Sequence, residues 1–247
     1  MLVPTFFPSK LQHQDQELQK EFSMLVWNIH KENQQQGFID YLETLLQSYP
    51  SDFLLFQEVK HPKTERYTLN NYSYALASNI ETSKNIFGVA TAAKVSFESI
   101  NTHISSIKDM IGLATHKSML ITEHLLHDKT ALFLVNLHAI NFVTLKSFTI
   151  EFEKITQILS LYQGAIIVGG DFNTWSKRRL KLLEDFQNDL ALQKAVIHAP
   201  HHVKALFSKP LDHLFYRGIT LQHAEALDTK NISDHNPIYA KFQVVDV

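Results

Sequence analysis

Short apolar runs that end abruptly in polar residues constrain the fold of this chain more than any other feature. Eight segments are rich in β-branched, aromatic or aliphatic residues, which is typical of buried strands. They span residues 24–29, 53–59, 87–93, 118–126, 131–140, 165–170, 211–216 and 237–245. The run AIIVGG at 165–170 leads directly into DFN. Because polar groups are costly to bury without partners, we expect this strand to end at a polar cleft.

Amphipathic helices are interspersed with these strands. The spacing of apolar residues predicts helices near 34–49 and 147–162. A third helix, near 176–192, is expected to begin at Ser176, because serine is a favoured N-cap residue. The predicted apolar sides are Phe38, Tyr41, Leu42, Leu45 and Leu46 in the first helix and Ile150, Ile155, Ile158 and Leu159 in the second. This arrangement predicts an α/β or α+β domain whose sheets are covered by helices.

The 247 residues are enough for one sizeable hydrophobic core. We expect residues 1–22 to form a leader that packs on the domain formed by residues 23–247. The leader lacks a basic start, and Pro4 and Pro8 interrupt its short apolar stretch, so it is a poor signal peptide. No run approaches the about 18 consecutive apolar residues that span a bilayer. These features predict a cytoplasmic protein without stable membrane insertion.

Cysteine usage and charge exclude several kinds of site. The chain has no cysteine, which excludes disulfides, thiolate metal sites and a cysteine nucleophile. The formal net charge of -2 gives no global support for tight nucleic-acid binding, although a local basic patch could still hold phosphates. Arg178, in the charge run 177–179, and Lys117 are candidates for such contacts. The alternative for Arg178 is a position at a solvated helix end, and the alternative for Lys117 is a lysine that protects a strand edge.

Other apolar runs also end in acids, amides or imidazoles. These polar residues are Asn28, Gln57 and Glu58, His138, Asp171 and Asn173, and Asp234 with His235 just before the last strand. Their repetition predicts that the strand ends converge on one cleft. Carboxylate and amide oxygens suit Mg²⁺ or Mn²⁺, and imidazoles can stabilise phosphate charge or transfer protons. The combination predicts a site that hydrolyses phosphoesters.

Six blocks of the sequence together resemble the endonuclease/exonuclease/phosphatase superfamily. In order they are WNI, QE, NLH, GDFN, LDHLFY and SDHNP, and the resemblance extends over roughly residues 24–243. This superfamily includes DNase I, exonuclease III-type abasic endonucleases, neutral sphingomyelinases and inositol polyphosphate 5-phosphatases. Longer matches such as GDFNTWSKRR and ISDHNPIYAKF are most similar to its YafD-like bacterial branch. The resemblance implies a DNase I-like, four-layered αββα sandwich of two mainly antiparallel sheets, with helices outside.

The resemblance also implies which residues bind metal and phosphate. Glu58 would be the main ligand of Mg²⁺ or Mn²⁺, with Asn28 close by and Asp234 as a further acid on the metal side. Asn141 matches a phosphate-contacting asparagine of some members. His138 occupies a position that is histidine in the DNase I and sphingomyelinase branches and tyrosine in abasic endonucleases. That match argues against abasic-site repair.

Together with His138 as a catalytic residue, four further residues would carry the reaction in a member of this superfamily. Asp171 would orient or deprotonate the attacking water, and Asn173 would help to fix that water and a phosphate oxygen. His235 would donate a hydrogen bond to a non-bridging phosphate oxygen. Asp212 would hold His235 in its orientation and tautomer, as buried carboxylates do for catalytic imidazoles.

Three functions are compatible with these residues. The favoured one is a monomeric, metal-dependent phosphodiester hydrolase, an endonuclease or exonuclease acting on nucleic acid. The second is a phosphatase or phospholipase C-type hydrolase of inositol phosphates or sphingomyelin, which the lack of an apolar hairpin for reaching a bilayer disfavours. The third is a catalytically inactive binding module. It is disfavoured because the acid, amide and histidine positions are all retained.

Overall fold

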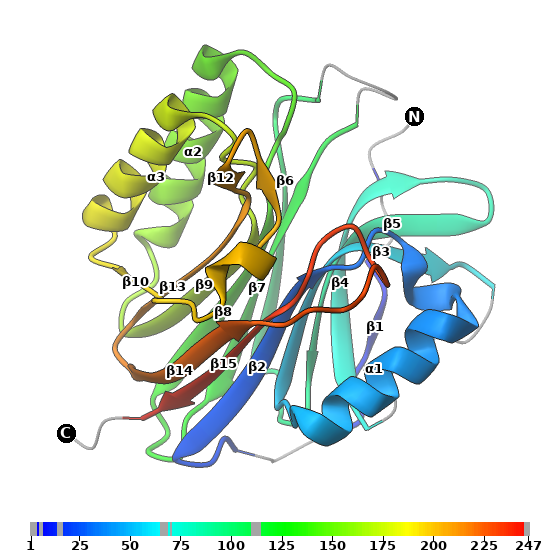
Figure 1. Ribbon diagram of the computed structural model, residues 1–247. Helices are drawn as coiled ribbons and strands as arrows, with labels where there is room; N and C mark the ends of the chain where they lie inside the picture. The colour runs from blue at the N-terminus through cyan, green and yellow to red at the C-terminus, as the bar shows by residue number, and fades with distance from the viewer. Residues whose placement is uncertain are drawn as a thin grey trace.

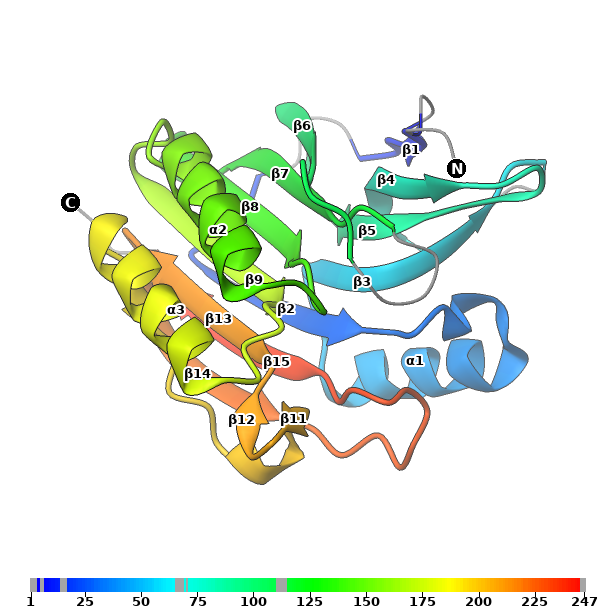
Figure 2. The same ribbon diagram turned by 90° about the horizontal axis from the view of Figure 1, so that it is seen from above.

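Two large β-sheets lie face to face, and helices cover their outer faces (Figure 1). The computed structural model describes residues 4, 7–13, 17–64, 69, 71–109 and 115–244. Seen from above, the layers follow one another as helix, sheet, sheet and helices (Figure 2). This is the four-layered DNase I-like sandwich that the family resemblance implies.

The first sheet has seven strands and the second has six within the described ranges. The strands of the first are β1 (Ser9–Lys10), β2 (Glu21–Asn28), β3 (Phe53–Pro62), β4 (Ser73–Glu81), β5 (Asn85–Ala93), β14 (Thr220–Ala226) and β15 (Ile238–Gln243). Those of the second are β6 (Ser99–Ile104), β7 (Ser118–Leu125), β8 (Ala131–His138), β9 (Ala165–Asp171), β10 (Gln193–Lys194) and β13 (Asp212–Arg217).

The helices and a small hairpin complete the described chain. The α-helices are α1 (Gln36–Ser48), α2 (Leu145–Leu159) and α3 (Lys177–Asp189), and the 3₁₀ turns are η1 (Glu32–Gln34) and η2 (Pro200–His202). The hairpin pairs β11 (Ala205–Leu206) with β12 (Lys209–Pro210). Helix α1 lies outside the first sheet, and α2 and α3 lie outside the second (Figure 2). None of the described helices is long and apolar enough to cross a membrane.

One parallel pair of strands lies in the middle of each sheet, and the other pairings are antiparallel. The strand orders are β1-β4-β5-β3-β2-β15-β14 and β10-β13-β9-β8-β7-β6. The parallel pair β2–β3 places Asn28 beside Gln57, and the pair β8–β9 places His138 beside Asp171. Because parallel strands run in one direction, their carboxyl ends lie side by side. A hydrogen bond between Asn28 and Asp171 shows that both sets of ends meet at one edge.

The central strands are buried on both faces, which explains their nearly continuous apolar runs. In β2, Met24 and Val26 belong to the core between the two sheets, whereas Leu25 and Trp27 belong to the core beneath α1. Strand β9 alternates in the same way between the inter-sheet core and the core beneath α2 and α3. A strand of this kind has no solvent-facing side, so polar residues can follow only where it ends.

The predicted helices are present, with one error in the buried side of α2. The side chain of Ser176 caps α3 by accepting a hydrogen bond from the Arg179 backbone N–H. The predicted packing of Ile150 is wrong, because this residue is 44% exposed. Phe148 and Phe152 are buried in its place. They fall on the stripe at i and i+4 that faces the sheet, and Ile150 lies between these rows.

The N-terminal leader is described only in part, since residues 1–3, 5, 6 and 14–16 lie outside the described ranges. Within it, β1 pairs with β4 and aligns Ser9 with Ala75. The division into leader and domain remains a prediction. The predicted last strand, 237–245, is observed as β15, which ends at Gln243, and residue 245 is outside the described ranges. The sequence analysis did not include β4, β6 and β14.

A neutral histidine lies in the middle of the inter-sheet core. His124 packs against the rings of Phe53 and Phe97, with centroids 4.9 and 4.7 Å away. Its Nδ1 donates to the carbonyl oxygen of Ser96 at 2.7 Å, and its Nε2 accepts from the hydroxyl of Thr122 at 3.0 Å. Burial lowers the pKa of His124 to about 4. The imidazole is therefore uncharged in the folded protein at neutral pH.

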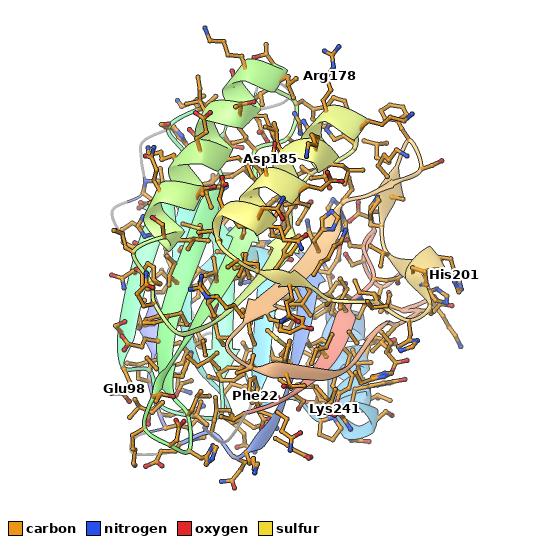
Figure 3. The ribbon with its side chains drawn as sticks, turned by 90° about the vertical axis from the view of Figure 1, so that its left-hand side faces the viewer. Phe22, Glu98, Arg178, Asp185, His201 and Lys241 are labelled. Carbon is orange, nitrogen blue, oxygen red and sulfur yellow. The ribbon has the colours of Figure 1, made fainter. Side chains whose placement is uncertain are left out.

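We predict that His124 makes the protein sensitive to acid. Between pH 6.5 and 4 the unfolded chain binds a proton at this position and the folded chain does not, so stability falls as the pH falls. The contribution over this window is about 3 kcal/mol. Urea unfolding at pH 7 and pH 4.5, followed by circular dichroism, should show a smaller loss for His124→Gln than for the wild type. The exposed His201→Gln is the control (Figure 3), and equal losses in all three proteins would contradict the prediction.

Candidate active site

Asp171 is the centre of a buried cluster at the edge where the strands end. Its Oδ2 accepts a hydrogen bond from Nδ2 of Asn28 at 3.1 Å. The same oxygen lies 3.6 Å from Nε2 of His138 and 3.9 Å from Nε2 of His235. The structure therefore brings together four residues that the sequence proposes for one site. They come from β2, β8, β9 and the loop before β15.

A glycine and an asparagine turn the chain at the end of β9. A Cβ at Gly170 would lie 1.9 Å from the carbonyl oxygen of Leu137, and the glycine has φ 144°, so only glycine lets the two strands approach this closely. Asn173 follows with a left-handed backbone, φ 52°. Its N–H donates to Oδ1 of Asp171 at 3.0 Å, and its Nδ2 donates to the carbonyl oxygen of Ala139 at 3.0 Å. The turn thereby fixes both the Asp171 carboxylate and the neighbouring loop.

His235 and Asp212 form a buried hydrogen-bonded pair. Nδ1 of His235 donates to the two carboxylate oxygens of Asp212 at 2.9 and 3.0 Å. Burial lowers the pKa of His235, but Asp212, Asp171 and Asp234 together outweigh burial and raise it to about 9. The backbone oxygen of His235 accepts from Nε1 of Trp27 at 2.8 Å. The result is an oriented imidazolium whose Nε2 faces Asp171.

Glu58 leaves the strand ladder in a strained conformation. A register shift in β3 lies between Phe56 and Val59, and Glu58 has a left-handed backbone, φ 55°. Such strain in a non-glycine residue is common at functional sites. Burial raises the pKa of Glu58, but its interactions with His138, Lys117 and Lys31 together outweigh burial and lower the pKa to about 2. The carboxylate is therefore anionic, and it forms an ion pair with the Lys31 ammonium.

His138 lies between the two carboxylates and remains neutral. Its Nε2 is 3.6 Å from Asp171 and 4.0 Å from Oε1 of Glu58. Lys117 donates to this nitrogen through Nζ at 2.9 Å. Burial is the main cause that lowers the pKa of His138 to about 4. Lys117, proposed from the sequence as a phosphate ligand, is thus placed within the cluster, where its Nζ also lies 3.7 Å from Asp109.

Other predicted residues lie outside this cluster or are occupied by local contacts. Asp234 has a side chain that is 48% exposed, and it pairs with Lys204 at 3.4 Å. Arg178 is exposed on α3, and its side chain points away from the domain (Figure 3). Asn141 lies in the loop after β8, where its Oδ1 accepts from Nε1 of Trp175 at 2.9 Å. The structure therefore does not bring the Asp234 carboxylate or Arg178 into the buried cluster.

Arg179, which the sequence analysis did not single out, joins the two loops that border the cluster. Its guanidinium donates to the backbone oxygens of Asn173 at 2.9 Å, of Val143 at 3.2 Å and of Asn141. One loop follows β9 and the other follows β8. Arg179 is 1% exposed, and burial lowers its pKa to about 10. It therefore acts as a buried clamp on the backbone beside the site.

The spacing of apolar residues in α3 could have predicted that Arg179 is buried. Arg179, Leu183 and Phe186 are the buried residues of the helix, and they recur at i, i+4 and i+7. The guanidinium lies over the rings of Phe148 and Trp175, 4.1 and 4.4 Å from their centroids. A planar cation can stack on aromatic faces in this way. The charge run on α3 is thus divided, with Arg178 in solvent and Arg179 in the core.

A second set of polar residues lies beneath the cluster and connects the two sheets; it joins Gln57, which the sequence analysis named, to Asn136, which it did not. Gln57 donates through Nε2 to Oδ1 of Asn136 at 2.7 Å. Asn136 in turn donates through Nδ2 to the backbone oxygens of Ala90 at 2.8 Å and Phe56 at 3.2 Å. All these groups are buried, so each hydrogen bond is needed to offset desolvation. The pair holds β3 against β8 directly under the site.

The chain matches the model of the endonuclease/exonuclease/phosphatase family over residues 25–235. It belongs to this family, whose members hydrolyse phosphodiester bonds. A UPF0294 protein of Yersinia enterocolitica is 32% identical to it over 231 residues, which cover 89% of this chain and 83% of that protein. A UPF0294 protein of Vibrio cholerae is 30% identical over 233 residues, with 93% and 80% covered. The expected similarity to the YafD-like branch is confirmed.

Solved structures show the same fold at low sequence identity. An endonuclease/exonuclease/phosphatase from Bacteroides vulgatus superposes with a TM-score of 0.69 at 16% identity, covering 92% of this chain and all of that one. The catalytic domain of human Nocturnin with bound sulfate gives 0.66 at 15% identity, with 93% and 96% covered. Zebrafish (D. rerio) TDP2 in complex with a single-strand DNA product gives 0.64 at 15% identity, with 92% and 100% covered.

Members of this superfamily depend on divalent metal ions, and the residues at the site fit such an ion. Glu58 offers an anionic carboxylate whose side chain is 19% exposed, and its pairing with the Lys31 ammonium shows that a cation is accommodated there. A hard cation of the Mg²⁺ type needs only one or two protein carboxylates, because it keeps several waters. Asp171, Asp212 and His235 form a second group, with potential ligand atoms within 4.8 Å of one another.

We predict that Arg179→Met lowers the free energy of unfolding by about 3 kcal/mol, because three buried backbone oxygens lose a charged donor. Arg178→Met, one residue away and exposed, is the matched control and should change it by less than about 0.5 kcal/mol. Urea unfolding followed by tryptophan fluorescence measures both. Similar small effects in the two variants would show that the clamp contributes no stability.

Proposed function

We propose that this protein is a Mg²⁺- or Mn²⁺-dependent phosphodiester hydrolase that acts on nucleic acid as an endonuclease or exonuclease. The observation that carries the proposal is the arrangement around Asp171. A buried carboxylate faces the oriented imidazolium of His235, and the second carboxylate, Glu58, lies on the other side of His138. A base, an anion-stabilising donor and a cation ligand are the groups that in-line attack of water on a phosphodiester requires.

Asp171 is suited to take a proton from water. Burial raises the pKa of its carboxyl, and a base with a raised pKa accepts a proton more readily at neutral pH. Asn28 and the N–H of Asn173 hold one carboxylate oxygen each, so the carboxylate has a fixed direction. The attacking water would lie against this carboxylate, with the Asn173 amide helping to fix it.

His235 and Lys117 would bind the charge on the phosphate. His235 keeps its proton at neutral pH, so Nε2 can donate to a non-bridging oxygen as negative charge develops there. Asp212 maintains the orientation and tautomer of the ring. Lys117 already donates to His138 at the same edge and can turn one N–H toward the phosphate.

The implied metal would be held by Glu58, with Asn28 close by. When bound, a divalent cation polarises the phosphate and neutralises charge in the transition state. Asp212 is engaged by His235 through both carboxylate oxygens, which supports Glu58 rather than the Asp212 group as the ligand. Asp234, at the solvent-facing side, remains a proposed additional acid. A monomeric state and a cytoplasmic location also remain predictions.

Two structural neighbours solved with bound DNA support a nucleic-acid substrate. TDP2 was solved with a single-strand DNA product, and a 3′ phosphatase from Neisseria was solved with a DNA hairpin product. Both likenesses are below 25% identity, so they show the fold alone. The proposal for this chain depends on its own cluster.

We predict that the protein nicks supercoiled plasmid when Mg²⁺ or Mn²⁺ is added, and that Asp171→Asn reduces the rate at least about 100-fold, because general bases contribute on this scale. Asp185→Asn is the control, an exposed acid on α3 (Figure 3). Full metal-dependent activity in Asp171→Asn would refute the proposed base.

If the wild type does not nick plasmid DNA, inositol phosphates and sphingomyelin are the next substrates to test. Absence of metal binding by calorimetry would then indicate an inactive module.

We predict that Asp212→Asn moves the alkaline limit of activity to lower pH. In the wild type the pKa of His235 is about 9, so the ring stays protonated up to about that pH. Without the Asp212 charge this pKa falls, so the imidazolium is lost from a lower pH upward. At pH 8, kcat/KM should decrease at least about ten-fold more than at pH 6. An alkaline limb at the same pH in both enzymes would show that His235 does not act as the imidazolium.

A further inference from the structure

A cavity of about 130 Å³ lies between α2 and the outer face of β6, β7 and β8, next to the candidate active site. Figure 2 shows α2 running along these strands. Lys117 and His138 line the cavity and also belong to the catalytic cluster. A substrate group that entered it would therefore be attached close to the reacting phosphate. No step of the proposed mechanism uses this space.

The size and lining of the cavity favour a single aromatic ring. Its walls include the apolar side chains of Met119, Leu137, Phe152, Ile155 and Ile158. An apolar cavity of about 150 Å³ in a protein core accommodates benzene. One six-membered ring fits this volume, whereas a fused two-ring system is larger. A bare ion would lose its hydration against such walls.

His103 gives one wall of the cavity a polar group that needs a partner. Its Nε2 is buried, and within the described ranges no group forms a hydrogen bond with it. Turning the imidazole about its Cβ–Cγ bond therefore breaks no bond at this nitrogen and can present it to an occupant. Burial, and to a smaller extent Lys154, lowers the pKa of His103, so the neutral ring can accept or donate. An alkyl chain would leave this nitrogen unpaired, at a cost that a heterocycle with polar edges avoids.

Two lysines and one carboxylate, Glu151, line the cavity. The Glu151 carboxylate already accepts hydrogen bonds from the Ser106 hydroxyl and the Ile107 N–H, so the lysines favour an occupant attached to negative charge. Lys117 stands at the end that adjoins the cluster, where its Nζ contacts His138 at 2.9 Å. Lys154, exposed on α2, stands at the rim. A ring that carries a sugar phosphate would place its apolar body between these two ammonium groups and its phosphate toward Lys117. A neutral lipid tail uses neither charge.

We propose that this cavity is a base-binding subsite that takes the pyrimidine ring of the nucleotide next to the reacting phosphate. The proposal rests on the proposed function in that the phosphate lies at the cluster around Asp171. It gives the enzyme a preference for cleavage beside pyrimidines in single-stranded nucleic acid. In duplex nucleic acid the paired base would first have to leave the stack.

Binding of three small phosphates to the wild-type protein, measured by calorimetry without metal, tests the subsite. The probes are thymidine 5′-monophosphate, deoxyadenosine 5′-monophosphate and the base-free 2-deoxyribose 5-phosphate. We expect thymidine monophosphate to bind about ten-fold more tightly than the base-free probe, the scale of burying one base against a protein wall. The purine nucleotide should bind less tightly than the pyrimidine nucleotide. Equal affinities for thymidine monophosphate and the base-free probe would overturn the proposal.

Two substitutions on the same helix provide matched variants. Ile155→Trp fills the cavity and should abolish the preference for thymidine monophosphate over the base-free probe. Ile150→Trp makes the same change at a position that is 44% exposed and does not line the cavity, and it should retain the preference. His103→Leu provides a variant that does not fill the space and should reduce the preference several-fold. Retention of the full preference in Ile155→Trp, with native circular dichroism, would overturn the subsite.

The binding readout separates this proposal from the proposed function. If thymidine monophosphate binds with the expected preference and no nucleic acid is cleaved, the subsite is supported and the nuclease proposal fails. If nucleic acid is cleaved and binding shows no dependence on the base, the nuclease proposal is supported and the subsite is overturned.

Discussion

The hydrogen bond between Asn28 and Asp171 is the contact on which the site depends, because it joins the two sheets at their shared edge. Each partner ends one strand of a central parallel pair, and each pair belongs to a different sheet. Packing the sheets face to face brings these ends within reach of each other. Below this contact, Gln57 and Asn136 connect the sheets a second time. The sandwich and the cluster are therefore produced by the same packing.

The cluster holds three ionisable groups in different protonation states within a few ångströms. Glu58 is an anion with a pKa of about 2, His138 is neutral with a pKa of about 4, and His235 is a cation with a pKa of about 9. The two histidines are both buried, and their neighbours decide the difference. Asp212 bonds to His235 and favours its charge, whereas Lys117 bonds to His138 and opposes it. Environments that separate the pKa values of similar side chains are typical of catalytic sites.

Much of the fold could be predicted because the central strands are buried on both faces. Their apolar runs stand out in the sequence, and the acid, amide and imidazole at their ends mark one edge. The strands β4, β6 and β14 carry no such signal. Strand β6 reads SINTHI and β14 reads TLQHAEA, and both are largely half-buried or exposed. Strand β4 contains alanines and polar residues that are buried only because neighbouring strands cover them.

The details of the site depended on features that a linear pattern does not show. Adjacent arginines on α3 differ completely in burial, because a helix turns by about 100° per residue, and only Arg179 faces the loops. Asp234 is exposed and pairs with Lys204, 30 residues away in sequence, a contact that the linear pattern does not show. Glu58 reaches its place through a left-handed backbone within a β-strand. Such a conformation is determined by the surrounding structure, since the residue type alone does not favour it.

Substitution of Gly170 would disturb the geometry of the candidate active site, although this residue has no side chain that could take part in the reaction. Any Cβ at this position would meet the Leu137 carbonyl at 1.9 Å, and relief of that overlap must separate β9 from β8. The next residues on those two strands are Asp171 and His138. Replacing Gly170 even by alanine would thus separate Asp171 from His138 and lower activity as the loss of a catalytic side chain does. In a mutational scan, position 170 would be grouped with the catalytic residues, although glycine contributes only the absence of a side chain.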